Sequence, residues 1–392
     1  MNPLVLDVET TIKGNGDWAN RDNRLCLVGL LSQTETTIYD IEYTIHPYDD
    51  CIRNIQLAVD ACDIIVGFNI KFDLHWLLNY GISINKPVYD LQLAEFVFSG
   101  QQNVYPSLDK TAMRYGLGQK LDVVKTEYWE KGIDTPEVPK DILYDYLEQD
   151  LKLTERLYKT HLALSIPENT KTLLELLNED LMCILEMEHN GLYYDEDLAK
   201  EERKLYKSEL DTIDFNLGSF FPDCPWINWN SGDHVSAILF GGTIKWVERE
   251  EVGVFLTGQK IGLPRYKINR YEKEFPRLAQ PAKGTALKKD GLYSTGEDAF
   301  QKVTKASKEA KAIVKLLQRK SKLEKLVGTY YHNDDETKGI ATLGRRKNWD
   351  SNRLFGSYDQ CVAITGRLAS NSPNQQNFPE EVDRLLYSRF ED

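Results

Sequence analysis

Two carboxylates, Asp7 and Glu9, stand two positions apart in the otherwise apolar segment Leu4–Thr11. Side chains of a strand alternate between its two faces, so both acids should project from the same face while Leu6 and Val8 project from the other. Neighbouring negative charges are costly at neutral pH unless a proton or a cation intervenes, and a hard divalent metal is a common solution. A solvated strand end fits the same pattern, so the metal hypothesis requires further acids.

Two later segments supply such acids. Asp73 falls in the first turn of a helix that follows the apolar strand predicted over 63–68, where the helix dipole alone could also explain it. Tyr146 and Asp150 are four residues apart, and therefore neighbours, on an amphipathic helix predicted over 141–164. Four converging carboxylates suit two divalent ions about 3.5 to 4 Å apart, which stabilise the attacking and leaving oxygens of a phosphodiester. Oxygen ligands favour Mg²⁺ or Mn²⁺ over zinc.

The first part of the chain alternates strands with helices, which predicts an α/β domain. Strands are predicted over 24–31 and 36–41 after a polar loop at 12–23, and a helix over 53–61. The second part is predicted to be mainly helical. Its helices are expected at 173–188, 195–215, 232–240, 297–304 and 310–331.

Length and composition indicate a soluble globular protein of two or three domains, since the chain has 392 residues. No apolar run approaches the roughly 20 residues of a membrane span, and no leader precedes the first strand, so we expect a cytoplasmic protein with no membrane partner. The six scattered cysteines are predicted to be buried free thiols.

The net charge of -13 is unevenly spread. Residues 251–350 carry 22 Lys and Arg against 12 Asp and Glu, which gives +10, whereas residues 1–250 carry 22 against 43, which gives -21. A basic block in the same chain as a candidate metal site favours a polyanionic partner. Arg319 and Lys322 on the helix 310–331 are candidate phosphate contacts, although a solubilising surface would look the same.

The motifs Asp7-x-Glu9, Asn69-x-x-x-Asp73 and Tyr146-x-x-x-Asp150 resemble those of the DEDD superfamily of 3'-5' exonucleases, tyrosine subtype. The resemblance covers about residues 1–165 and implies a ribonuclease H-like fold with a mixed five-stranded sheet flanked by helices. It further implies that Asp7 bridges two metal ions, that Glu9 and Asp150 hold the ion that activates water, and that Asp73 serves the second ion. Tyr146 together with Glu9 would orient the water, and Asn69 would help to hold the terminal nucleotide.

A second resemblance lies near the end of the chain. Thr365-Gly366-Arg367-Leu368 and the segment 373–379 are similar to the Thr-Gly-Arg-Leu and Pro-Asn-x-Gln-Asn-x-Pro segment of family A DNA polymerases. The segments 188–192, 238–242 and 293–295 resemble the thumb of that family. Over essentially its whole length the chain resembles the compact polymerases of bacteriophages. If it is encoded by a phage, this resemblance implies that the protein acts in the cytoplasm of a bacterial host. It implies that Arg367 reaches the minor groove at the primer terminus. Three further residues would line the primer-template: Asn374, Gln376 and Asn377.

These resemblances predict three parts: an exonuclease domain at 1–165, a mainly helical thumb-like DNA-binding region at 166–350, and the start of a polymerase palm at 351–392. The chain stops where the family carries its first palm aspartate, so we expect no primer extension by this chain alone. A fragment, an intron- or intein-interrupted product and one half of a split polymerase remain open.

The function expected from the sequence is a two-metal 3'-5' DNA exonuclease that proofreads for a family A polymerase in DNA replication. A single-stranded 3' end would enter the exonuclease cleft while the thumb holds the primer-template duplex. The alternative is a non-catalytic DNA-binding half that needs a second chain. An RNA-processing exonuclease of the same superfamily is a further alternative, which the polymerase-like half disfavours.

Overall fold

The computed structural model describes the chain except for residues 1, 34, 42–47, 120–121, 290, 304, 332–346, 349–352 and 389–392. The chain forms two compact units, which we describe separately. The first consists of residues 1–196 together with 341–392, and the second of residues 197–340. The polymerase-like C-terminal segment is thus part of the same unit as the carboxylate motifs.

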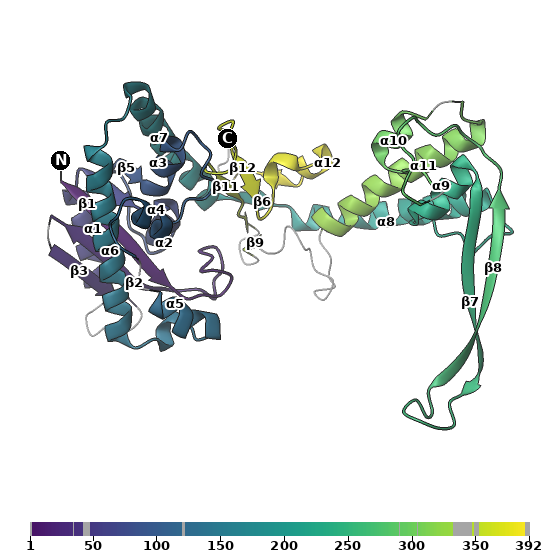
Figure 1. Cartoon of the computed structure of the whole chain (residues 1–392), viewed down its shortest axis with the longest axis horizontal. Helices are drawn as coiled ribbons and strands as arrows, with labels where there is room; N and C mark the ends of the chain where they lie inside the picture. The colour runs from purple at the N-terminus through teal and green to yellow at the C-terminus, as the bar shows by residue number, and fades with distance from the viewer. Residues whose placement is uncertain are drawn as a thin grey trace. The chain divides into compact units, whose positions relative to one another are not determined.

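A five-stranded mixed sheet forms the centre of the first unit (Figure 1). Its strands in spatial order are β3 (Glu35–Asp40), β2 (Leu25–Ser32), β1 (Pro3–Thr10), β4 (Ile64–Gly67) and β5 (Val88–Asp90). β1 pairs antiparallel with β2 and parallel with β4, so β1 is the strand where the sheet changes direction. This central position places the first two acids in the middle of the sheet.

The two faces of β1 belong to two different apolar clusters, as strand alternation requires. Leu4, Leu6 and Val8 pack in the cluster that includes helices α1 (Tyr48–Ala61), α2 (Ile70–Asn79) and α3 (Leu91–Phe98). Val5 faces the other way, toward leucines of α6 (Lys140–Ala163). Asp7 and Glu9 share the parity of Val5, and the face of β1 covered by α6 therefore carries the acids.

Shorter helices and α7 (Glu168–Asn190) complete this part of the first unit. They are α4 (Leu108–Arg114), α5 (Val123–Glu127) and the 3₁₀ turns η1 (Trp129–Lys131) and η2 (Thr135–Glu137). The side chain of Asp90 caps α3 by accepting from the backbone N–H groups of Gln92 and Leu93, as a cap residue of this type should.

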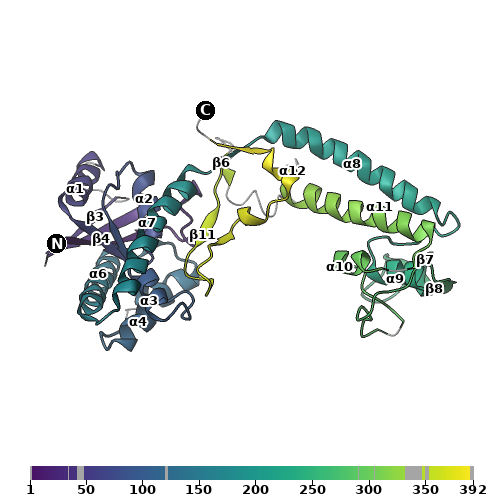
Figure 2. The same ribbon diagram turned by 90° about the horizontal axis from the view of Figure 1, so that it is seen from above.

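Small sheets join α7 to the C-terminal segment. β6 (Leu192–Tyr194) pairs with β10 (Arg353–Leu354) and with β13 (Leu386–Tyr387), and β10 pairs with β9 (Lys347–Asn348). β11 (Ser357–Asp359) and β12 (Ala369–Asn371) form a hairpin that lies against α7 (Figure 2). A 3₁₀ turn η6 (Gln375–Asn377) and helix α12 (Glu380–Asp383) follow.

The second unit pairs two long helices, α8 (Glu196–Ser219) and α11 (Lys308–Lys325), the latter extended by a π-helical turn at Leu326–Tyr330. Arg319 on α11 binds Glu209 on α8, and Lys320 binds Asp214. Two shorter helices, α9 (Gly232–Phe240) and α10 (Glu297–Gln301), complete the helical part. Helices outnumber strands among the described residues of this unit, and the predicted thumb-like region at 166–350 stays a prediction.

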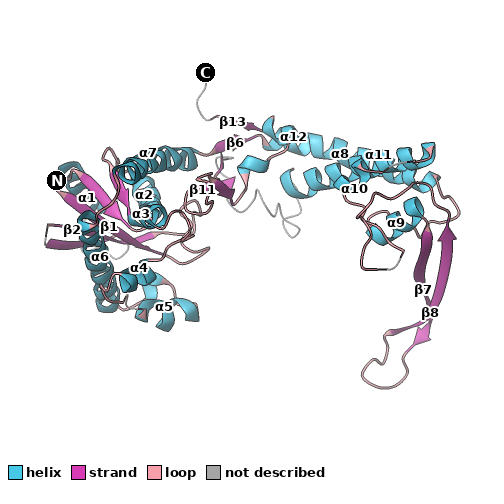
Figure 3. Ribbon diagram, turned by 45° about the horizontal axis from the view of Figure 1, so that its top comes forward, coloured by secondary structure: helices cyan, strands magenta, loops and turns pink. Residues whose placement is uncertain are grey.

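A long two-stranded ribbon projects from this unit (Figure 3). Its strands are β7 (Gly242–Val254) and β8 (Pro264–Phe275), paired antiparallel with a register shift between Glu251 and Gly253. Trp246 anchors the base of the ribbon by stacking on Trp226, with ring centroids 3.7 Å apart. The sequence pattern predicts neither of these strands.

All six cysteines are free, as predicted, but the expectation that all are buried is wrong for Cys183, which lies exposed on α7. Among the described residues, no helix is long and apolar enough to cross a membrane.

Candidate metal and nucleic-acid site

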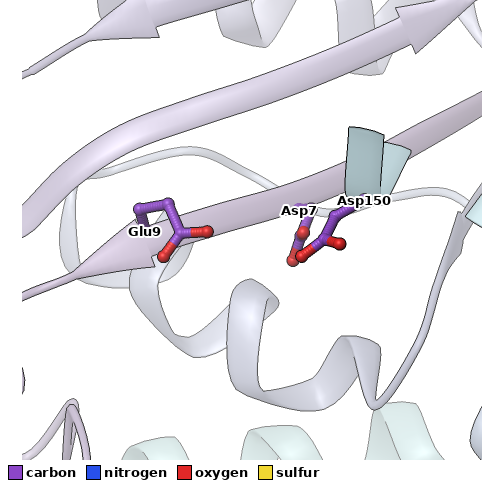
Figure 4. A group of neighbouring side chains, drawn as sticks. All are labelled: Asp7, Glu9 and Asp150. Carbon is purple, nitrogen blue, oxygen red and sulfur yellow. The ribbon is translucent and has the colours of Figure 1, made fainter. Parts of the chain in front are cut away.

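Three of the predicted acids meet at one point. Ligand oxygens of Asp7, Glu9 and Asp150 all lie within 4.8 Å of one another. Figure 4 shows Asp7 and Glu9 projecting from one strand, with the Asp150 carboxylate directed toward Asp7. Glu9 and Asp150 are buried, and Asp7 is partly buried. The two motifs are 141 positions apart in sequence, and the packing of α6 on β1 unites them.

Gly29 explains how α6 approaches the sheet so closely. It pairs with Asp7 in the β1–β2 ladder and therefore faces α6 as Asp7 does. A Cβ atom at this position would lie 2.7 Å from Leu151 Cδ1 and 2.9 Å from Leu147 Cγ, both on α6. The missing side chain lets the helix seat against β2, and the seated helix brings Asp150 to Asp7.

Asp73 lies beside this group rather than in it. Its Oδ1 accepts a hydrogen bond of 2.9 Å from the backbone N–H of Val8, the residue between the two β1 acids. Burial raises the pKa of Asp73 well above its usual range, and the negative charge of Asp7 raises it further. The carboxyl group of Asp73 is therefore close enough to Asp7 for their charges to interact.

The donor set fits a hard divalent cation. It consists of carboxylate oxygens without a cysteine or histidine ligand in the group that the described residues form, and oxygen ligands of this kind suit Mg²⁺ or Mn²⁺. Burial is the main cause of the raised pKa of Asp73, and the negative charge of Asp7 adds to it. Repulsion between neighbouring buried acids is unfavourable without a counter-charge. A bound cation would relieve it.

Tyr146 lies one helical turn before Asp150 on α6 and is 4% exposed. Its ring meets the edge of Trp129, with centroids 5.8 Å apart and planes at 83°. Trp129 is fixed in turn, because its Nε1–H donates to Thr135 Oγ1 at 3.1 Å. Thr135 Oγ1–H donates to the carbonyl of Thr10 at 2.6 Å, which ties this segment to the end of β1.

A cavity of about 420 Å³ opens beside Glu9. Its wall includes Phe72 from α2, Trp129 from η1 and the loop residues Asn15 and Gly16. Gly16 has a φ of 70°, and a Cβ there would lie 2.5 Å from Thr10 Oγ1 and 3.2 Å from Phe72. Only glycine fits this position, so the loop can close over the end of β1.

Sequence reasoning missed several of these residues. Trp129 and Thr135 lie in a stretch without a recognised motif, and only the fold brings them to β1. The sequence contains one local indication of a tight loop at this cavity, the segment Gly14-Asn15-Gly16, in which two glycines flank an asparagine. In the structure Asn15 has a φ of 60°.

Asn69, predicted to hold a nucleotide, adopts a left-handed conformation at the start of α2 (φ 59°, ψ 46°). Asp90 fixes this conformation, because its carboxylate accepts from the backbone N–H groups of Asn69 at 3.2 Å and Ile70 at 3.0 Å. Asn69 lines a second cavity, of about 580 Å³, and Asn15 and Phe72 line both cavities.

The four polar residues predicted to contact primer-template are all exposed. Arg367 follows Gly366 in the loop that joins β11 to β12, and Gly366 has a φ of 72°. The remaining three lie at or next to the η6 turn: Asn374, Gln376 and Asn377. Their contact with DNA stays a prediction.

The two predicted phosphate contacts on α11 differ in their surroundings. Arg319 donates from Nε and Nη2 to the two carboxylate oxygens of Glu209, at 2.7 and 2.8 Å, so in this structure its guanidinium serves the α8–α11 packing. Lys322 is exposed on α11. Phosphate contact by either residue stays a prediction.

Comparison with known proteins gives the class. Residues 273–389 match the model of DNA polymerase family A. The chain is 27% identical over 336 residues to DNA polymerase I of Borreliella burgdorferi, and the match covers 83% of this chain and 30% of that protein. It is 22% identical over 361 residues to the DNA polymerase of Bacillus phage SP01, covering 81% of this chain and 34% of that protein.

A solved structure gives the same indication for the fold. It is described as the POL domain of Pol1 from M. smegmatis in complex with DNA primer-template and dNTP, and it superposes with a TM-score of 0.56 at 17% identity. The match covers 97% of this chain and 53% of that one. The chain is similar to the family A DNA polymerases, which confirms the polymerase resemblance predicted from its sequence. It spans about a third of the length of the Borreliella and phage polymerases.

Proposed function

We propose that the first unit is a metal-dependent 3'-5' DNA exonuclease of a family A DNA polymerase that acts in DNA replication. The observation that carries the proposal is the meeting of Asp7, Glu9 and Asp150, with Asp73 held next to them by the backbone of Val8. The sheet order and the change from antiparallel to parallel pairing at β1 support a ribonuclease H-like exonuclease fold.

Two divalent cations bound by these acids would lower the pKa of an attacking water and offset charge on the departing 3' oxygen. The chain's own residues do the rest. Glu9 and Tyr146 orient the water, and the cavity beside Glu9 holds the terminal nucleotide between Phe72 and Trp129. Asn69, whose backbone is held by Asp90, lines the larger cavity, which shares Asn15 and Phe72 with the cavity beside Glu9.

Shortening of single-stranded DNA tests the proposal. The purified chain is incubated with Mg²⁺ and an oligodeoxynucleotide labelled at its 5' end, and stepwise loss from the 3' end is expected. Asp150→Asn should lower the rate by about 10²-fold or more, because a lost ligand removes cation affinity. Asp145→Asn changes an exposed acid on the same helix and should leave the rate within about 2-fold, as surface changes do.

Two outcomes contradict the proposal. One is the absence of shortening by the unmodified chain with either Mg²⁺ or Mn²⁺. The other is equal activity in the Asp150→Asn and Asp145→Asn preparations, which would point to a contaminating nuclease. An oligoribonucleotide of the same sequence separates the RNA-processing alternative, for which degradation of RNA should exceed that of DNA.

A second candidate function is that of a DNA-binding part of a polymerase whose remaining residues lie on another chain. The exposure of Arg367 in the family-matching segment favours it. Tight binding of primer-template duplex without nuclease activity would support this function over the first. On either proposal, DNA is the partner.

A further inference from the structure

A buried ionic cluster joins α2 to the C-terminal segment at a place that the proposed chemistry does not use. Glu188 on α7 is at its centre, and its side chain is 2% exposed. Its Oε1 binds Lys71 Nζ at 2.7 Å and accepts the backbone N–H of Tyr358, on β11, at 2.5 Å. Its Oε2 lies 2.8 Å from Nε2 of His75. Lys71 also donates to the carbonyl of Tyr358 at 2.5 Å.

The protonation states of this cluster are defined by its contacts. Burial lowers the pKa of His75 to about 4, so the ring is neutral at pH 7 and donates Nε2–H to Glu188. Burial opposes ionisation of Glu188, but the hydrogen bonds from His75 and Lys71 outweigh it and lower its pKa. The cluster therefore holds one carboxylate paired with one ammonium group, and the two partners share few contacts with solvent.

The cluster binds the side of α2 that faces away from Asp7 and Glu9. Lys71 and His75 are four residues apart and share a helix face, whereas Asp73, two positions from each, points to the opposite side. There Asp73 accepts the N–H of Val8. α2 is thus held from both sides, by β1 through Asp73 and by α7 and β11 through Glu188.

The same helix forms walls of both cavities. Phe72 lines the cavity beside Glu9, and Asn69, Lys71 and Phe72 line the larger one. Ser357 and Asp359 of β11 complete the wall of the larger cavity, so the hairpin that Glu188 binds is also part of this surface. Cys361, just beyond β11, packs in the apolar cluster that contains α2.

From this arrangement we infer that Glu188 is a positioning residue for the exonuclease site, which clamps α2 to the backbone of Tyr358 and makes the polymerase-like hairpin a support of the nuclease. This inference rests on the proposed exonuclease function. Residues 353–388 then have a role in the nuclease as well as any role at a primer terminus. Loosening the clamp moves the walls of the cavities, while Asp7, Glu9 and Asp150 stay in place on β1 and α6.

The test compares Glu188→Gln with Glu186→Gln, the same chemical change at an exposed position on the same helix. Glu188→Gln should raise KM for a single-stranded oligodeoxynucleotide by about tenfold, since the buried ammonium group of Lys71 loses its charged partner, and change kcat by less than about threefold. Lys71→Met should act in the same direction and serves if Glu188→Gln does not fold. Glu186→Gln should match the unmodified chain in both parameters.

Hydrogen exchange supplies a readout that does not depend on activity. In Glu188→Gln the amides of residues 357–359 and of α2 should exchange faster by about tenfold, whereas Glu186→Gln should leave them unchanged. Unchanged exchange in both segments would overturn the clamp. Faster exchange with an unchanged KM would overturn its role in the nuclease. If the unmodified chain has no nuclease activity, the proposed function fails, and the exchange comparison alone decides whether the clamp exists.

Discussion

At the scale of single residues, the site depends on acids whose charges are placed close together. Asp7 and Glu9 could be predicted as a pair from strand alternation, because the period of two is a property of the backbone. The meeting with Asp150 could be predicted only through a resemblance, since no local pattern connects a strand to a helix 141 positions later. Trp129 and Thr135 could not be predicted, because their contacts are tertiary.

Tyr146 should contribute to the rate and not to cation binding. Tyr146→Phe keeps the ring that packs against Trp129 and removes only the hydroxyl. We expect the exonuclease rate to fall by about 10- to 100-fold, since the variant loses a group that orients or exchanges a proton with the attacking water. Mn²⁺ affinity, measured by titration, should be unchanged, and an unchanged rate would remove Tyr146 from the mechanism.

A second residue-scale prediction concerns His161, on α6, whose Nε2 lies 2.9 Å from Glu95 Oε1. Burial, with a smaller contribution from Arg114, lowers the pKa of His161 to about 4 from 6.5. The unfolded chain therefore binds the proton first as the pH falls, so His161 stabilises the fold above pH 6.5 and this contribution is lost between pH 6.5 and 4.

The comparison with His161→Gln isolates this effect from that of the buried acids, whose raised pKa values act in the opposite direction. The difference in unfolding free energy between the two proteins should shrink by up to about 3 kcal/mol as the pH falls from roughly 7 to 4. A difference that stays constant over this range would show that His161 is protonated equally in the folded and unfolded states.

At the scale of elements, long periodic segments were predictable and irregular ones were not. α6, predicted over 141–164, is observed at Lys140–Ala163, and α9 has its predicted bounds. The β7–β8 ribbon was missed, because its exposed strands carry charges at many positions, although Gly258 and Gly262 mark the turn between them. Its apolar residues, such as Ile268 and Val247, are exposed, so no core constrains their pattern.

The seat of α6 on the sheet should be sensitive to one methyl group. Gly29→Ala places a Cβ against Leu147 and Leu151, which should displace α6 and lower the unfolding free energy by about 1 to 3 kcal/mol. Because α6 carries Asp150, exonuclease activity should fall as well. Gly218→Ala is the matched control: it lies in α8, a Cβ there meets nothing within 4 Å, and it should not destabilise the chain. Equal stability of the two variants in urea unfolding would contradict this account of the helix seat.

At the scale of the whole molecule, the division into units does not follow the boundaries expected from sequence. The contact pattern groups residues 166–196 and 341–392 with the first 165 residues. The predicted functional boundaries at 165 and 350 stay predictions. The physical reason for the grouping is that β6 pairs with both β10 and β13, and that Glu188 binds β11, so distant segments close on one another.

DNA binding should be electrostatic in large part. The affinity for a primer-template duplex, measured by fluorescence anisotropy, should fall steeply between about 50 and 200 mM salt, by about tenfold for every two phosphates contacted. Arg367→Ala should weaken binding by about 1 to 3 kcal/mol if the side chain reaches the DNA. Lys159→Ala removes a cation that pairs with Glu155 on α6 and serves as the control, with no expected change. Equal affinities of the two variants would exclude Arg367 from the DNA interface.

The central claim is that Asp7, Glu9 and Asp150 form a cation site with Asp73 beside it. Titration with Mn²⁺, followed by electron paramagnetic resonance, tests it most directly and needs no substrate. The account predicts saturable binding by the unmodified chain that Asp7→Asn weakens by about 10- to 100-fold and that Asp145→Asn leaves unchanged. Identical Mn²⁺ binding by the unmodified chain and Asp7→Asn would contradict it.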